Sequence, residues 1–238
     1  MDCPKCRAVL PDDAAECAHC GIIVAKYLER EESVPPPPIQ DRAPGSAELF
    51  IVDTTPSKAA VAGRGIFLVF LAYVTTTLIG GVNAERGMFL DIANLVFHEA
   101  GHMLFSPFGR FMTVLGGSLT QVLVPLLCAG AFLWQTRDPF AAAFGIWWAG
   151  ESLTDVAPYI ADARDLKLVL LGGKTGAEVE GHDWEYLLNA LGVAHKDHAI
   201  AAVVQVIGIL TMIAALVWGA LVVLNQFGML RRSRSTGL

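Results

Sequence analysis

The chain has 238 residues, of which 54% are hydrophobic and 17% are charged, and its mean hydropathy is +0.50. These values lie outside the range of a soluble globular domain and predict a membrane protein, so the lipid bilayer is an expected partner. The net charge of −6 comes from acidic residues scattered along the chain, so no basic patch indicates binding to nucleic acid.

The first motif along the chain consists of two C-x-x-C pairs, Cys3 with Cys6 and Cys17 with Cys20. Four thiolates with this spacing suit the tetrahedral coordination of zinc. The pattern resembles the zinc-ribbon family, which implies a structural zinc ion and a module that recognises a protein partner. We therefore expect residues 1–30 to form a zinc ribbon without catalytic chemistry. Disulfide bonds between the same cysteines are the alternative, which a reducing cytoplasm disfavours.

Residues 31–63 contain four consecutive prolines, a composition typical of an extended linker. Three later segments carry no charged residue and are long enough to cross about 30 Å of hydrocarbon as helices; they are 65–84, 111–136 and 199–230. Two further apolar segments, 88–108 and 139–160, carry histidine or acidic residues, which mark functional sites inside membranes. We expect an all-α, multi-pass membrane domain of four to six apolar segments over 64–230 and a basic tail at 231–238.

The charges that flank the apolar segments predict the topology. The chain opens with polar residues rather than with a secretory signal peptide, and Lys58 and Arg64 precede the first expected span. The positive-inside rule then places the zinc ribbon in the cytoplasm, with the protein in the cell membrane. Arg231 and Arg232 favour the cytoplasm for the C-terminus too. Five full crossings cannot satisfy both ends, so we expect one motif-bearing segment to be re-entrant or broken, unless the C-terminal arginines lie on the other side.

Segment 88–108 contains an H-E-x-x-H motif formed by His98, Glu99 and His102. Residues four apart share one face of a helix, so both imidazoles can bind one metal ion. Glu99 then lies where it can take a proton from a metal-bound water, as peptide hydrolysis by a metalloenzyme requires. These polar side chains are costly in so apolar a segment unless they have a partner, which favours a metal site over hydrogen-bonded packing.

A zinc hydrolase needs a third protein ligand, and the candidates follow in segment 139–160. Glu151 and Asp155 lie one helical turn apart, and Tyr159 continues that face. The pattern resembles thermolysin-like and membrane-embedded Ste-twenty-four peptidases, which implies Glu151 as zinc ligand and Asp155 as the acceptor that orients a histidine. The embedded motif also resembles site-two proteases, which implies Asp155 or Asp162 as ligand, although the Asn-Pro-x-x-Asp-Gly signature is absent. A helix-end pair near lipid headgroups is the third interpretation.

Two further features concern the surroundings of the site. A glycine-rich loop ends at His182, where we expect an amphipathic helix capped by Asp183. Tyr159 and His182 are candidate oxyanion donors, and a capping or surface role is the alternative for His182. The polar segment 116–121 is expected either to line a water cavity or to allow close helix packing.

These patterns predict a membrane-embedded zinc endopeptidase with one catalytic and one structural Zn²⁺, acting on polypeptides in or near the membrane. One alternative is a non-catalytic membrane adaptor whose metal site only joins helices. The other is a di-iron oxidase, because Glu99-x-x-His102 is half of the carboxylate-bridged iron pattern. The oxidase needs a second E-x-x-H on another helix, and the apolar segments contain none.

Overall fold

The computed structural model describes residues 2–3, 5–11, 14–26, 49–50, 57–79 and 89–235. The chain divides into two units, residues 1–42 and 43–238. The described residues form helices and isolated β-bridges, which confirms the all-helical fold class for this part of the chain. Most of the linker expected at 31–63 lies outside the described residues, and residues 58–63 already belong to the first long helix.

The first unit contains the same turn twice, and each turn starts at the first cysteine of a C-x-x-C pair. The N–H of Cys3 donates to the carbonyl of Ala8, and the N–H of Cys17 donates to the carbonyl of Ile22, both at 2.9 Å. Each turn folds the chain back on itself and directs its cysteines inward. The small core of this unit consists of Cys3, Leu10, Cys17 and Val24.

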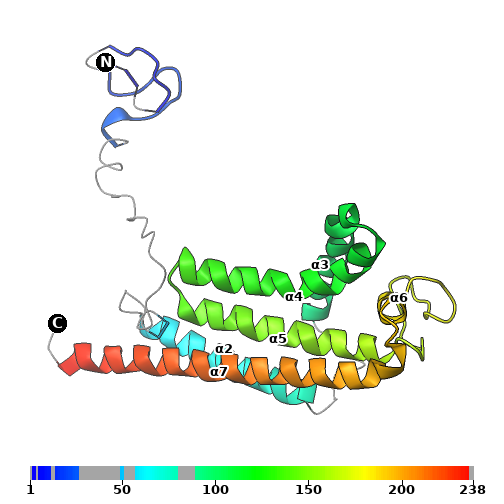
Figure 1. Cartoon of the computed structure of the whole chain (residues 1–238). Helices are drawn as coiled ribbons and strands as arrows, with labels where there is room; N and C mark the ends of the chain where they lie inside the picture. Colours follow the sequence, from blue (N-terminus) through cyan, green and yellow to red (C-terminus); the bar gives the residue numbers. More distant parts are fainter. Residues whose placement is uncertain are drawn as a thin grey trace. The chain divides into compact units, whose positions relative to one another are not determined.

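Four long helices form the bundle of the second unit in its described part, and two shorter helices lie at one end of it (Figure 1). The long helices are α2 (Lys58–Ile79), α4 (Arg110–Trp134), α5 (Pro139–Ala161) and α7 (Asp197–Ser235), and the shorter ones are α3 (Phe89–Phe105) and α6 (Asp183–Ala190). Single 3-10 turns at Ser106–Phe108 and Ala194–Lys196 lead into α4 and α7. α5 packs between α4 and α7, and α2 packs against α7.

The start of α2 and the end of α7 lie at the same end of the bundle, opposite α3 and α6 (Figure 1). Arg64 of α2 donates to the carboxylate of Asp138 at 2.7 Å, and Asp138 caps the start of α5. α3 crosses the first part of α4 at a steep angle instead of running along the long helices. Arg64, near the start of α2, and Arg231, near the end of α7, therefore lie at the same end of the bundle.

Among the described residues, three helical segments are long and apolar enough to cross a membrane. They are Lys58–Ile79, Arg110–Trp134 and Ala194–Arg232, which match the three charge-free segments of the sequence. Large apolar side chains are exposed on them, for example Phe70 and Leu210. These features are consistent with membrane association. The more polar α5 is not among the three, and it is buried between its neighbours.

The long helices α5 and α7 approach closely at two glycines. A Cβ atom at Gly208 would lie 2.7 Å from the carbonyl oxygen of Gly150 and 2.8 Å from Cγ2 of Thr154. Carbon atoms do not approach a backbone this closely without displacing it. The two helices can therefore keep this separation only with glycine at the crossing.

We expect Gly208→Ala to lower the free energy of unfolding by about 1–3 kcal/mol, because the methyl group overpacks the crossing. Gly228 lies in the same helix, and a Cβ there would meet no atom within 4 Å. Gly228→Ala should raise the free energy of unfolding by up to about 1 kcal/mol, since alanine is the better helix former. Thermal unfolding in detergent, followed by circular dichroism, compares the two. Shifts of the same sign and size would contradict the close crossing.

Candidate metal centre

The helix α3 places His98 and His102 on one face, with ring centroids 4.8 Å apart. This face can approach α4 closely because a glycine lies on each side of the crossing. A Cβ at Gly116 would lie 2.6 Å from the carbonyl oxygen of Gly101, and a Cβ at Gly101 would overlap the backbone of Gly116. Gly101, the second of the two residues between Glu99 and His102, therefore allows both imidazoles to lie against α4.

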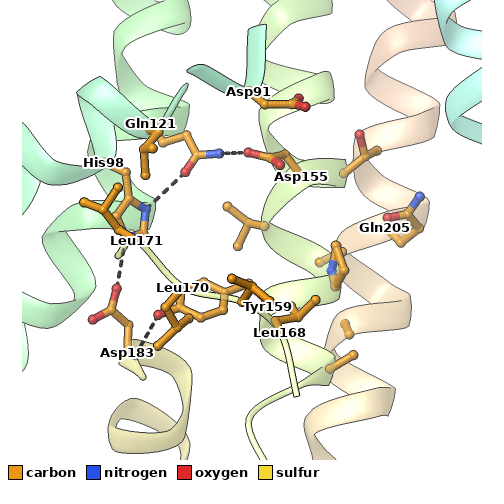
Figure 2. A pocket seen from close by; sticks show the side chains of 18 of the residues that line it. Asp91, His98, Gln121, Asp155, Tyr159, Leu168, Leu170, Leu171, Asp183 and Gln205 are labelled. Atoms are coloured by element: carbon orange, nitrogen blue, oxygen red, sulfur yellow. Dashed lines mark hydrogen bonds and ion pairs between the residues drawn. The ribbon is translucent and has the colours of Figure 1, made fainter. Parts of the chain in front are cut away.

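The Nε2 atoms of both histidines face one oxygen of a third residue, Asp183. Oδ2 of Asp183 lies 2.9 Å from Nε2 of His98 and 3.3 Å from Nε2 of His102. Asp183 is the first residue of α6, and its N–H donates to the hydroxyl oxygen of Tyr159 at 2.9 Å (Figure 2). Burial raises the pKa of the Asp183 carboxyl, but when the rings carry a proton on Nε2 their hydrogen bonds to this carboxyl outweigh burial and hold its pKa below the usual value. Asp183 therefore presents a carboxylate to the two rings.

The other nitrogen of each ring is held by a residue of α4. Nδ1 of His102 lies 2.9 Å from the main-chain oxygen of Thr113, and Nδ1 of His98 lies 3.2 Å from Oε1 of Gln121. A carbonyl oxygen only accepts, so each Nδ1 carries a proton, and a neutral ring then has its lone pair on Nε2. Two lone pairs and a carboxylate thus face one point. Without a metal, both rings would have to be cations beside each other in a largely buried site, which is costly.

The space between the two rings is open only because α4 carries glycine at position 117. A Cβ at Gly117 would lie 2.6 Å from Nε2 of His98 and 2.7 Å from Nε2 of His102. The ligand atoms of His98, His102 and Asp183 lie within 4.8 Å of one another. Zinc bonds of 2.0–2.2 Å in tetrahedral geometry separate ligand atoms by about 3.3–3.6 Å. The three side chains could therefore hold one metal ion after small shifts, with a fourth position left open.

The candidate metal centre borders an open cavity of about 1170 Å³ within the second unit (Figure 2). Glu99 lines this cavity and its side chain is exposed. The loop between α5 and α6 contributes apolar residues 168–171, and α7 contributes Gln205. The point where the two histidines and Asp183 meet is therefore accessible from this cavity.

The acids expected to supply the third ligand, Glu151 and Asp155, do lie on one face of α5, but neither contacts an imidazole in the described structure. Oε2 of Glu151 accepts from the amide nitrogen of Asn94 at 3.0 Å. Oδ2 of Asp155 accepts from Nε2 of Gln121 at 2.6 Å. Asp155 therefore reaches His98 only through Gln121, and the structure brings Asp183 rather than Glu151 to the histidine pair.

Asp162, the other aspartate considered as a ligand, holds the loop that follows α5. Its two carboxylate oxygens accept from the N–H groups of Lys167 at 2.8 Å and Leu168 at 2.9 Å. Its Oδ2 also lies 3.4 Å from Nε2 of His182. Asp162 is therefore separate from the group formed by the histidine pair.

The cap of α6 is His182, not Asp183 as expected from the sequence. Nδ1 of His182 accepts from the N–H of Glu185 at 3.2 Å, and burial lowers the pKa of His182, which keeps the ring neutral for this role. Because the cap lies one residue earlier, Asp183 is released from capping and faces the histidines. His182 does not line the described cavity, whereas Tyr159 does, with its ring centroid 6.2 Å from that of His98.

The sequence did not indicate Asp183 as a candidate ligand, nor Gln121 and Thr113 as the residues that hold the rings. Acidic residues are common at the start of a helix, because they cap it and interact favourably with its dipole. The position of Asp183 in the sequence therefore did not distinguish a metal ligand from a capping residue. The glycine-rich loop before it was the available indication. Such a loop lets the chain return from the end of α5 to α3, the helix that carries the H-E-x-x-H motif.

The four cysteines of the first unit form a second group that could hold a metal ion. The Sγ atoms of Cys3 and Cys20 lie 3.7 Å apart, as do those of Cys6 and Cys17. Zinc–sulfur bonds of about 2.3 Å in tetrahedral geometry separate sulfur atoms by about 3.8 Å. All five cysteines of the chain are described and none forms a disulfide bond. The four cysteines could therefore hold one metal ion.

Comparisons of the chain with protein-family models, with curated proteins and with solved structures find no match. The fold and the geometry define a helical bundle with apolar segments and two groups of side chains that could each hold a metal ion. The chemistry of these two groups is therefore the basis for a functional proposal.

Proposed function

We propose that this protein is a membrane-embedded zinc endopeptidase that cleaves polypeptides in or next to the bilayer. One observation carries the proposal: the Nε2 atoms of His98 and His102 meet the carboxylate of Asp183 beside an open cavity lined by Glu99. Three protein ligands with one free position are typical of catalytic zinc, whereas structural sites are closed. An aspartate ligand from a later segment also agrees with the resemblance to site-two proteases.

Zinc bound here would lower the pKa of a water molecule to about 7 and polarise a peptide carbonyl. Glu99 accepts the proton of the attacking water and then passes it to the leaving amine. The hydroxyl oxygen of Tyr159 accepts from the N–H of Asp183, and its own O–H can turn to donate to the oxygen of the attacked carbonyl. Each residue of the motif and its surroundings then has one defined task in hydrolysis.

In this proposal α2, α4, α5 and α7 cross the cell membrane, and α3 does not. Four crossings place the ends that carry Arg64 and Arg231 together in the cytoplasm, as the positive-inside rule requires. The acids of α5 face protein instead of lipid, because α5 is packed between α4 and α7. The metal centre then lies toward the non-cytoplasmic end of the bundle.

The cysteine group has a separate, structural task in the proposal. Four thiolates close the coordination shell of zinc, so this site holds a fold together and leaves no position for a substrate. A module of this size folds only with its metal. We assign it a structural zinc ion and the binding of a protein partner in the cytoplasm, where reducing conditions preserve the thiols.

The proposal is tested by Asp183→Ala, which should remove the catalytic zinc and abolish proteolysis. Full-length protein in detergent is expected to carry one zinc ion at each group, and the variant should keep only the ion of the cysteine group. Proteolysis is measured on β-casein, an unstructured protein, by mass spectrometry of new N-termini. Glu151→Gln is the control, since Glu151 contacts Asn94 and neither histidine, and it should keep both ions. Equal zinc content in wild type and Asp183→Ala would refute the proposed centre.

A further inference from the structure

A series of hydrogen bonds connects α5 to the metal centre, and it begins at Trp148. The indole N–H only donates, and it donates to Oδ1 of Asn94 at 2.9 Å. The carbonyl end of the Asn94 amide therefore faces Trp148, and its NH2 end faces the two acids of α5. That NH2 group lies 3.0 Å from Oε2 of Glu151 and 3.4 Å from Oδ2 of Asp155. Because Asn94 is fully buried, this orientation is fixed by protein groups alone.

The same reasoning fixes the amide of Gln121. Oδ2 of Asp155, which accepts from Asn94, also lies 2.6 Å from Nε2 of Gln121 (Figure 2). A carboxylate oxygen accepts, so the NH2 end of Gln121 faces Asp155 and its carbonyl end faces Nδ1 of His98 at 3.2 Å. The ring of His98 must then carry its proton on Nδ1. In the neutral ring that a metal ligand requires, the lone pair is then on Nε2, the atom that faces Asp183.

We propose that Asp155 is a positioning residue that sets the tautomer of His98 through Gln121 and so makes Nε2 the metal-binding atom. The inference rests on the proposed zinc centre and assigns a role to an acid that the hydrolytic steps do not use. What Asp155 supplies is an oxygen acceptor for the Gln121 amide, not its charge. Without that acceptor the amide can turn its NH2 end toward Nδ1, which favours a proton on Nε2, where it blocks metal binding.

Two variants of Asp155 separate the acceptor from the charge. Leucine has no acceptor, so Asp155→Leu should weaken zinc binding at the centre by about 10- to 100-fold, the usual effect of losing a group that orients a ligand histidine. Asparagine keeps one oxygen that can accept from both Gln121 and Asn94, so Asp155→Asn should bind zinc as wild type does. Affinity is measured on the full-length protein in detergent by competition with a chelator.

The matched control is Glu151→Leu, which removes the other carboxylate that accepts from Asn94, while the amide of Gln121 donates to Asp155 and not to Glu151. This variant should keep the wild-type zinc affinity. The proposal is overturned if Asp155→Leu binds zinc as wild type does. It is equally overturned if Asp155→Asn is as weak as Asp155→Leu, because the charge would then be what matters.

Nitrogen-15 NMR of histidine-labelled protein reads the tautomer without zinc or activity. The measurement uses metal-free Asp183→Ala at a pH where the ring is neutral, since this background removes the acceptor that faces Nε2. The His98 signal, assigned by its loss on adding His98→Ala, should show the proton on Nδ1, and adding Asp155→Leu should move it toward Nε2. A proton on Nε2 with Asp155 intact would overturn the proposal. A wild-type protein without zinc at the centre would refute the proposed function, whereas this tautomer result would still test the inference.

Discussion

Replacement of Glu99 by glutamine is expected to lower the rate of peptide-bond hydrolysis by about 100- to 10,000-fold, because an amide cannot accept the proton of the attacking water. The zinc ion should remain bound, since Glu99 lies outside the group formed by His98, His102 and Asp183. Initial rates of β-casein cleavage and zinc content are measured on the same preparation. A loss of rate with zinc retained is the signature of a proton-transfer residue.

The control for this variant is Glu185→Gln, an equal change of charge on α6 at a side chain that does not line the described cavity. It should leave the rate unchanged. Two results would contradict the role of Glu99. A wild-type rate in Glu99→Gln would favour a metal site that only joins helices, and a loss of zinc together with the rate would make Glu99 a ligand.

The second large effect is expected at Gly117, where alanine should prevent zinc from binding at the centre. The added methyl carbon would lie 2.6 Å from Nε2 of His98 and 2.7 Å from Nε2 of His102, in the space a metal ion needs. We expect zinc affinity at this centre to fall at least about 100-fold. Loss of a residue that only orients a ligand histidine lowers affinity by about 10- to 100-fold, and the added methyl group would lie closer to the metal than such a residue does. Proteolysis should fall with it, while the helix content stays the same, since alanine favours helix.

Gly130→Ala provides the matched control for Gly117→Ala. Gly130 lies in the same helix, α4, and a Cβ there would meet no atom within 4 Å. Zinc content and proteolysis should therefore equal those of the wild type. Chelator competition and the casein assay, applied to both variants, make the comparison. Normal zinc binding by Gly117→Ala would show that the ion is not held in the space between the two rings.

The sequence predicted the helices well because apolar, charge-free segments leave few alternatives to a helix in a membrane. It also predicted that Glu151 and Asp155 share one face of a helix, since residues four apart always do. The crossing of α3 over α4 was not predictable. It depends on Gly101 fitting against Gly116, and a glycine in an apolar segment has the same local pattern whether it packs closely or not.

The third ligand could not be chosen from the sequence for a related reason. The local spacing of Glu151 and Asp155 favoured them, but spacing shows which residues share a face and not which partner that face meets. In the structure the partners are Asn94 and Gln121, uncharged amides whose hydrogen bonds satisfy the acids. Asp183 reaches the histidines through a loop, and the path of a loop depends on long-range packing.

The most direct test of the metal centre is the anomalous diffraction of zinc in crystals of the full-length protein. We expect one zinc ion about 2.0–2.2 Å from Nε2 of His98, from Nε2 of His102 and from a carboxylate oxygen of Asp183. A zinc ion bound by Glu151 in place of Asp183, or no zinc between the two rings while the cysteine group is filled, would contradict this expectation.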